Sequence, residues 1–265
     1  MQKYIISYFW IMLRALIGVL LIPYWIWLIV VFLAFLITST VISLLLLLML
    51  GKKAHNPTMA VYKFWSTFFF VAAGIRIRVK NRERLYNNLP CIVVCNHGSN
   101  LDMFLGAYAM PTSIKPLAKM QLKKMPLLGF LFTTVCVMVD RSSKESRERS
   151  SRAMLETLQE GKSIFIFPEG TRNKGTKPVN EFYDGAFRFG IESGFPIVAM
   201  CTIGARSVTP SNGYSVRPGK IDIHFLGPYH TKDLTKEDLP ELKTRIFNDM
   251  FAEIKTQDPM FQSAE

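Results

Sequence analysis

Residues 91–102 have the sequence CIVVCNHGSNLD, in which an uninterrupted apolar run passes directly into a polar loop. A short apolar run of this kind, here preceded by the turn-forming residues 87–90 (NNLP), is typical of a buried strand. His97 then lies just beyond the carboxyl end of that strand, where α/β proteins place their functional groups. Residues 164–167 (IFIF) predict a second such strand, which Pro168 must end. Each of the two strands therefore leads into a polar loop.

Predicted strands and helices alternate along the rest of the chain. Period-two alternation and short apolar runs indicate strands, whereas apolar residues spaced three and four apart indicate helices. These patterns predict strands at residues 75–79, 114–118, 135–139, 196–203 and 221–226, and helices at residues 101–109, 142–160, 185–193 and 235–257. Ser142 and Glu145 match a capping box at the start of the second of these helices. The alternation predicts an α/β fold, a layered mixed β-sheet flanked by helices, over residues 55–265.

The N-terminal part of the chain is strongly apolar. Residues 15–50 contain no charged side chain. As one helix they would measure about 54 Å, against about 30 Å for the hydrocarbon core of a bilayer, so one straight span is excluded. Two arrangements fit: a pair of helices bent near Pro23 or near residues 38–40, or a tilted span followed by a helix at the membrane surface. Arg14 counts against a symmetric hairpin, because an arginine inside a bilayer is costly. We expect the two-helix membrane anchor, within residues 1–54.

The remainder of the chain is basic. The formal net charge is +12, and residues 1–50 contribute only Lys3 and Arg14 to it. A basic surface beside an apolar anchor suits anionic membrane lipids. Nucleic acid is the competing partner, but the sequence has no zinc-finger spacing, recognition-helix motif or Arg/Gly-rich tail, so we expect none. Residues 56–73, which are aromatic and nearly uncharged, predict a helix that lies either at the membrane surface or in the core.

Cysteine usage indicates a reducing compartment. The four cysteines lie in apolar stretches without CxxC or Cys/His metal spacing; they are Cys91, Cys95, Cys136 and Cys201. Reduced, buried thiols are typical of the cytoplasmic side of a membrane. We therefore expect neither a disulfide nor a metal ion.

His97 and Asp102 are the first pair of candidate functional residues. Neutral imidazole, with a reference pKa of about 6.5, is the usual base for removing a hydroxyl proton near neutral pH. A carboxylate bonded to its second nitrogen fixes the tautomer and stabilises the imidazolium that forms, and Asp102 can fold back to do this. A purely structural His–Asp pair is the alternative. Ser99 could be imagined as a nucleophile, but the sequence has no GxSxG elbow, and attack by an activated substrate hydroxyl is simpler.

The second loop adds groups that can hold an anion. Gly170 lets main-chain N–H groups approach an oxygen closely, and Arg172 can bind a phosphate through a two-pronged contact. Glu169 either accepts hydrogen bonds from the hydroxyl region of an acceptor or orders the loop. Arg141 is a second phosphate candidate, with a surface ion pair as the alternative. Lys119 could bind phosphate or a developing oxyanion, with a solvated lysine as the alternative. The two loops together indicate a site that deprotonates a hydroxyl beside a bound anionic group.

Both loops resemble signatures of the glycerolipid acyltransferases, most closely those of the bacterial 1-acylglycerol-3-phosphate (lysophosphatidic acid) acyltransferases. Residues 97–102 are similar to the family's His-x4-Asp signature, and residues 167–172 (FPEGTR) to its Phe-Pro-Glu-Gly-Thr-Arg signature. Residues 135–141 correspond to the middle motif that ends in Arg, and residues 195–198 to the fourth, apolar motif. The resemblance covers residues 60–230.

Three positions depart from the family's pattern. Val135 stands where Gly is often found, Ala199 where the fourth motif usually continues with Pro, and Asn173 where Ser is common. These departures leave acyl transfer untouched, but they leave the exact acceptor open.

The resemblance implies a role for each candidate residue. His97 is expected to act as the base and Asp102 to orient it. Acceptor phosphate is expected to bind through Glu169 and Arg172. The full expected substrate-binding set is Lys119, Arg141, Glu169, Gly170, Thr171 and Arg172.

The resemblance also implies an activity. It implies a membrane-bound O-acyltransferase, with its catalytic domain at residues 55–265, that moves a fatty acyl chain to the sn-2 hydroxyl of lysophosphatidic acid and gives phosphatidic acid. The expected donors are acyl-CoA or acyl carrier protein, without a metal or organic cofactor, at the cytoplasmic side of a bacterial inner membrane. Two alternatives stay open: an enzyme of the same family acting on another lysolipid, such as a lyso-aminolipid, or a catalytically silent membrane-binding protein. Acyl-chain length, the choice of donor and oligomeric state are left open.

Overall fold

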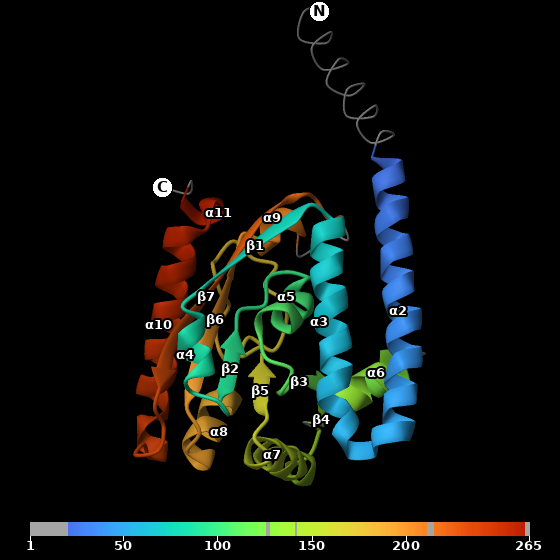
Figure 1. The fold of residues 1–265 in the computed structure, drawn as a ribbon. Coiled ribbons are helices and arrows are strands. Elements are labelled where there is room, and N and C mark those ends of the chain that lie inside the picture. Colours follow the sequence, from blue (N-terminus) through green and yellow to red (C-terminus); the bar gives the residue numbers. More distant parts are fainter. Residues whose placement is uncertain (1–20, 126–127, 141, 211–214, 263–265) are drawn as a thin grey trace, which may run out of the picture.

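A seven-stranded β-sheet forms the centre of the molecule, in the strand order β1-β7-β6-β2-β5-β3-β4 (Figure 1). The computed structural model describes residues 21–125, 128–140, 142–210 and 215–262. The strands are β1 (Ile75–Lys80), β2 (Ile92–Cys95), β3 (Ile114–Lys119), β4 (Val137–Val139), β5 (Ser163–Ile166), β6 (Ile197–Ile203) and β7 (Gly219–Tyr229). Neighbouring strands are parallel except β6 and β7, which are antiparallel. The predicted mixed sheet is confirmed.

Helices cover both faces of the sheet (Figure 1). On one face lie α2 (Ile22–Leu50), α3 (His55–Ala72), α5 (Asp102–Ala109) and α6 (Leu128–Val135), and on the other lie α7 (Lys144–Gln159), α8 (Gly185–Ser193) and α10 (Leu239–Gln257). The shorter elements are α4 (Arg82–Tyr86), α9 (Ala205–Val208), α11 (Pro259–Gln262) and the 3-10 turns η1 (Gly51–Ala54), η2 (Met120–Lys124) and η3 (Lys236–Asp238). The result is the layered α/β arrangement that the sequence predicts.

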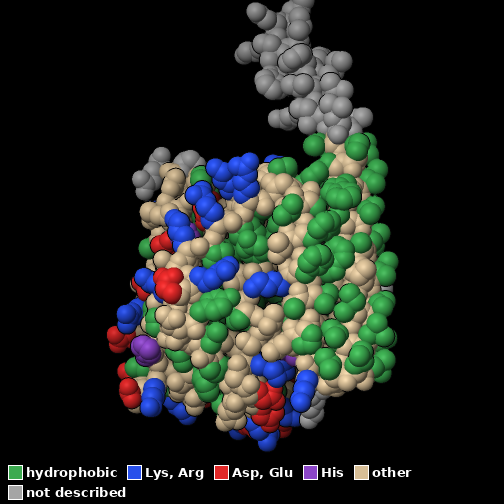
Figure 2. Space-filling view, in the orientation of Figure 1, with side chains coloured by type: hydrophobic (Ala, Val, Ile, Leu, Met, Phe, Trp, Pro, Cys, Tyr) green, Lys and Arg blue, Asp and Glu red, His purple; other side chains and the backbone are tan. Residues whose placement is uncertain are grey.

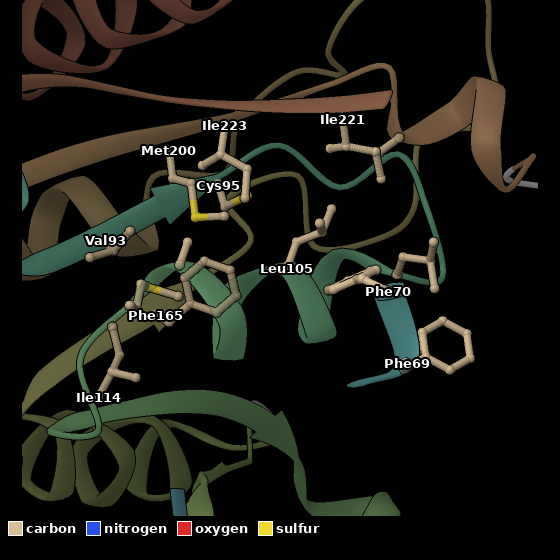
Figure 3. Close-up of a cluster of buried hydrophobic side chains, with 14 of the residues drawn as sticks. Phe69, Phe70, Val93, Cys95, Leu105, Ile114, Phe165, Met200, Ile221 and Ile223 are labelled. Carbon is tan, nitrogen blue, oxygen red and sulfur yellow. The ribbon is translucent and has the colours of Figure 1, made fainter. Parts of the chain in front are cut away.

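The central strands are apolar at every position because both of their faces are buried. In β5, Phe165 packs against the α3 and α5 side, whereas Ile164 and Ile166 pack against the α7 and α10 side. Figure 3 shows the first of these two cores, in which side chains from the strands, α3 and α5 come together, among them Phe165, Leu105 and Phe70. The carboxyl ends of β2 and β5 are thereby held rigidly between two layers of helices.

α2 is one continuous helix, so the bend predicted near residues 38–40 is wrong. Thr38 and Thr40 donate their hydroxyl protons to the carbonyl oxygens of Ala34 and Leu36, each at 2.6 Å, and both remain helical. Threonine hydroxyls that bond back one turn in this way can be accommodated within a helix. The alternative bend near Pro23 adjoins residues 1–20, which lie outside the described part of the chain.

The hydrophobic character of α2 is directed outward. In the described residues, α2 is the one helix long and apolar enough to cross a membrane, although core helices and signal sequences meet the same criterion. It packs beside α3, and Figure 2 shows hydrophobic side chains gathered over α2, whereas the charged side chains, lysine and arginine among them, lie over the rest of this face. η1 makes the turn between α2 and α3 and ends at the predicted boundary of residue 54. The helix predicted at residues 56–73 is α3, which has buried and exposed residues.

Two local predictions differ from the structure. The apolar run before residue 137 forms α6, and β4 begins only at Val137, because Val135 and Phe132 are held by the helical core beside α3. α7 is capped by Ser143, whose Oγ accepts the Ser146 N–H at 3.1 Å. Ser142 instead donates its N–H to Asp140 Oδ1 at 3.0 Å, so it belongs to the turn after β4.

Candidate active site

The parallel pairing of β2 and β5 brings the two polar loops together. Val94 lies opposite Ile166 in this pair, so His97 and Glu169 lie at equivalent positions beyond the two strand ends. β3 is the next strand beyond β5, and Lys119 is its last residue. The carboxyl ends of parallel strands meet at one edge of a sheet, which explains how groups distant in sequence share one site.

His97 and Asp102 form a directly hydrogen-bonded pair. His97 Nδ1 donates to Asp102 Oδ2 at 2.8 Å, and the Asp102 side chain is fully buried at 0% exposure. The same Oδ2 accepts the Ser99 N–H at 2.8 Å. Because Asp102 is also the first residue of α5, its negative charge lies at the favourable end of the helix dipole. The carboxylate is therefore fixed before it orients the imidazole.

The plane of the His97 ring is also fixed. Phe167 stacks on it with ring centroids 4.0 Å apart and an interplanar angle of 17°. With Nδ1 bonded to Asp102, the neutral ring carries its lone pair on Nε2. His97 lines a cleft of about 820 Å³, hereafter the catalytic cleft. This arrangement can take a proton from a hydroxyl bound in the cleft.

The loop after β5 holds the main chain of His97 from both sides. Glu169 Oε1 accepts the His97 N–H at 2.7 Å, and the Asn173 N–H donates to the His97 carbonyl oxygen at 2.6 Å. Glu169 Oε2 accepts the Asn180 N–H at 2.9 Å. Glu169 is only 2% exposed, and burial raises its pKa to about 7 from the ordinary 4.5, although both N–H bonds act in the opposite direction. Of the two roles left open for Glu169, this geometry describes the ordering of the loop.

The other residues of this loop face the catalytic cleft. Gly170, Thr171 and Arg172 line it together with Lys119. Gly170 has φ +66°, and a Cβ there would lie 2.9 Å from the Tyr183 ring, so glycine is required for the turn. Arg141 lies outside the described residues, and its predicted role stays a prediction.

Arg172 is held by a residue of the first loop. Its Nη1 donates to Asn100 Oδ1, which joins the end of the second signature to the middle of the first. The guanidinium is half-buried and lies in the same cleft as His97 and Lys119. The cleft therefore combines a base with two cationic side chains, as binding of a phosphorylated hydroxyl compound requires.

Comparisons with known proteins agree with this geometry. Residues 76–203 match the family model described as Acyltransferase. The acl-2 protein of Caenorhabditis elegans carries the name of a 1-acyl-sn-glycerol-3-phosphate acyltransferase. It is 30% identical over 207 residues, which cover 76% of this chain and 72% of that protein. The chain belongs to the glycerolipid acyltransferase family.

Further similarities extend over most of the chain. A 1-acyl-sn-glycerol-3-phosphate acyltransferase of Saccharomyces cerevisiae is 28% identical over 219 residues, 81% of this chain and 71% of that enzyme. The solved structure of the 1-acyl-sn-glycerophosphate acyltransferase PlsC of Thermotoga maritima has the same fold, with a TM-score of 0.75 at 21% identity. That likeness covers 92% of this chain and 97% of the other.

An acyltransferase can use its own nucleophile or an activated acceptor, and the geometry favours the acceptor. Ser99 is 0% exposed, and its Oγ accepts the Leu101 N–H at 3.1 Å. Cys95 is buried in β2, and burial raises the pKa of its thiol well above the ordinary value. Neither side chain lines the catalytic cleft, whereas His97 does. Within the described residues there is also no group of three or more His, Cys, Asp or Glu side chains suited to a metal ion.

Some residues that position the catalytic groups of this acyltransferase are not among those that the sequence predicts. Thr202 of β6 donates its hydroxyl proton toward Asp102 Oδ1 at 3.4 Å and Asn96 Oδ1 at 3.2 Å. Asn96 in turn accepts the Thr202 N–H at 2.7 Å, which ties β2 to β6 beside the active site. Asn100 could have been found from its place inside the first signature. Thr202 could not, because its contact depends on the pairing of two strands.

An apolar cavity of about 260 Å³ adjoins the catalytic cleft; we call it the α5 cavity. Met103 and Phe132 line both spaces. The other walls of the α5 cavity come from α2, α3, α5, α6 and the strands, and include Tyr62, Gly106, Ile114, Cys136 and Phe165. An apolar chain in this cavity could therefore present its polar end to His97.

Proposed function

We propose that the chain transfers a fatty acyl group from an acyl thioester to the sn-2 hydroxyl of lysophosphatidic acid, which gives phosphatidic acid. The observation that carries this proposal is the catalytic cleft, where a His97 ring oriented by Asp102 faces the same space as Arg172 and Lys119. Relatives named 1-acyl-sn-glycerol-3-phosphate acyltransferases support this choice of acceptor. The proposed reaction uses the acyl thioester as its second substrate and needs no cofactor.

The proposed reaction is a single transfer without an acyl-enzyme. His97 Nε2 removes the proton of the sn-2 hydroxyl as the oxygen attacks the thioester carbonyl carbon. Asp102 stabilises the imidazolium that forms. When the tetrahedral intermediate collapses, the carbon–sulfur bond breaks and the departing thiolate takes the proton back from His97. Arg172 and Lys119 hold the acceptor phosphate, and hydrogen bonds between charged groups contribute about 1.5–3 kcal/mol each.

The α5 cavity supports the use of a donor with an apolar acyl chain. The carbonyl of a thioester is the first carbon of its own chain, so the chain must leave the catalytic cleft directly. The shared walls at Met103 and Phe132 provide that exit. Acyl-CoA and acyl carrier protein carry the same thioester, and both remain proposed donors.

We further propose that the enzyme works at the cytoplasmic face of a membrane. α2 is 29 residues long, about 44 Å as a helix, and displays apolar residues to the outside. The four buried free thiols are consistent with a reducing compartment. The two-helix anchor within residues 1–54, the contact with anionic lipids and the location in a bacterial inner membrane stay predictions.

The proposal is tested by acyl transfer with the full chain purified in detergent, wild type beside His97→Ala. The acceptors are lysophosphatidic acid and several phosphate-free lysolipids, including a lyso-aminolipid, each with a long-chain acyl-CoA and with acyl carrier protein. We expect phosphatidic acid from the wild type and a loss of about 10²–10⁴ in turnover for His97→Ala, the usual contribution of a positioned base.

Each outcome has a distinct meaning. Full turnover by folded His97→Ala would overturn the mechanism. Product from phosphate-free lysolipids alone would keep the chemistry and remove the phosphate role of Arg172, in favour of the alternative acceptor. Absence of any transfer by the wild type with either donor would favour a silent membrane-binding protein.

A further inference from the structure

A second apolar cavity, of about 490 Å³, lies between α2 and the start of α5. We call it the α2 cavity. Its volume is within the range of about 300–1,000 Å³ that small-molecule sites occupy. Leu28 of α2, Phe69 of α3, Leu101 and Val216 form much of its wall. A cavity of this size and character can take a hydrocarbon chain.

The α2 cavity is separate from the α5 cavity, although the two are neighbours. Phe32, Asn100 and Phe104 line both of them, and the two aromatic rings form part of the division. The α5 cavity shares Met103 and Phe132 with the catalytic cleft, whereas the α2 cavity shares no lining residue with the cleft. The chain therefore has two apolar cavities: the α5 cavity adjoins the cleft that contains His97, and the α2 cavity lies farther from it.

Two polar residues line the α2 cavity, and one of them contacts a residue of the catalytic cleft. Asn100 lines the cavity and accepts a hydrogen bond from Arg172, which itself lines the cleft. Thr209 also lines the cavity and is only 1% exposed, and its Oγ1 is buried without a hydrogen-bond partner among the described residues. A buried hydroxyl without a partner favours a ligand that carries a polar group at this point.

The α2 cavity also borders the exposed apolar surface of α2. Ile29 lines the cavity and is nevertheless 58% exposed. Its neighbours Ile26 and Trp27 are also exposed, on the helix that Figure 2 shows covered with hydrophobic side chains. A lipid at this surface could slide its chain into the cavity without crossing a polar rim.

We propose that the α2 cavity holds the hydrocarbon chain that the acceptor already carries, a compartment distinct from the α5 cavity assigned above to the donor chain. This inference rests on the proposed function. In a lysolipid, an ester and a glycerol carbon separate the existing chain from the reacting hydroxyl, so that chain belongs in a compartment set back from His97. In the donor no such spacer exists, and its chain belongs in the compartment whose walls continue into the cleft.

A lysophosphatidic acid can extend from Arg172 in the catalytic cleft to the α2 cavity. Its phosphate lies on Arg172, its chain lies in the α2 cavity, and its glycerol passes Asn100, which contacts Arg172 and lines that cavity. His97 lies three residues before Asn100 in the same loop, and the proposed placement of the acceptor puts its free hydroxyl on the side of this base. Asn100 thus marks the point where the polar and apolar halves of the acceptor meet.

The experiment fills each cavity separately in the full chain purified in detergent. Leu28→Trp fills the α2 cavity, with Val216→Phe as a second variant on a different element in case the first does not fold. Ala107→Leu, which narrows only the α5 cavity, is the matched control. The measurement is kcat/KM for hexanoyl, lauroyl and oleoyl lysophosphatidic acid with one donor, and then for donors of the same three chain lengths with one acceptor.

We expect Leu28→Trp to lower kcat/KM for the oleoyl acceptor relative to the hexanoyl acceptor by about tenfold, the factor lost when roughly two methylene groups are left unburied. Its preference among donors should not change. Ala107→Leu should show the reverse pattern. If the α2-cavity variants shift the donor preference, or lower turnover equally for all acceptors, the assignment is overturned. Wild type that forms no phosphatidic acid from any of the three acceptors would instead overturn the proposed function.

Discussion

Glu169 restrains the main chain of the catalytic base. Its two carboxylate oxygens accept the main-chain N–H groups of His97 and Asn180 at 2.7 and 2.9 Å. In Glu169→Gln one oxygen becomes an NH2 group, which cannot accept a hydrogen bond from a main-chain N–H. Losing one such buried bond costs about 1–3 kcal/mol. We therefore expect turnover to fall by about tenfold, because the His97 main chain or the loop at Asn180 loses its restraint.

The free energy of unfolding should depend on pH in the wild type and lose part of that dependence in Glu169→Gln. Burial raises the pKa of Glu169 to about 7 from 4.5, so between these values the native state holds a proton that the unfolded chain has released. The free energy of unfolding then falls as pH rises through this window, and the ionised carboxylate costs about 3 kcal/mol above pH 7. Glu169→Gln removes this dependence. The difference in stability between variant and wild type should thus shift in the variant's favour by about 2–3 kcal/mol from about pH 5 to about pH 8.

The assay is thermal unfolding of both proteins in the same detergent over this pH range. A shift of that size corresponds to roughly 5–10 °C in the relative Tm. Other titrating groups are common to both proteins, so their contributions cancel in the difference, as does the constant cost of the lost hydrogen bond. Parallel Tm curves for wild type and Glu169→Gln from acid to alkaline pH would refute the reasoning, as would a variant with undiminished turnover.

Two further predictions concern the first loop. Asn100→Ala removes one hydrogen bond that positions Arg172, so the KM for lysophosphatidic acid should rise by about tenfold, the effect of one hydrogen bond to a charged group; an unchanged KM in steady-state kinetics would contradict the role of this contact. Ser99→Ala removes a buried hydroxyl that accepts the nearby Leu101 N–H, so turnover should stay within about tenfold of wild type. Trapping of an acyl-serine by mass spectrometry, or loss of all turnover in that variant, would reopen the nucleophile role.

The sequence predicts the position of the active site well because strand ends are local features. The apolar runs before His97 and Pro168 identify two buried strands, and both exist within a residue or two of the predicted bounds. Their direct pairing, with Val94 opposite Ile166, is not contained in either run. It results from the order of strands in the whole sheet, which depends on how the helices pack on its two faces.

The sequence predicts less well wherever a side chain has a choice between local and distant partners. For Glu169 the sequence allows substrate contact or loop ordering, and only the fold shows that main-chain N–H groups occupy both of its oxygens. The apolar residues before Val137 suit a strand or a helix equally, and packing beside α3 selects the helix. The hydroxyls of Thr38 and Thr40 could end a helix, but both bond back within it instead. In each case the deciding contact is set by geometry rather than by residue type.

The loop after β5 combines two tasks that are usually considered separately. Through Glu169 and Asn173 it fixes the main chain of His97, and through Arg172 it contributes the cation proposed to bind the acceptor phosphate. Arg172 also reaches back to Asn100, which lies between His97 and Asp102 in the first loop. A displacement of the guanidinium would therefore act on the first loop at Asn100 and, through the loop after β5, at His97. The proposed phosphate site and the base are thus joined by direct contacts, and we expect an acceptor without phosphate to be disfavoured in turnover as well as in affinity.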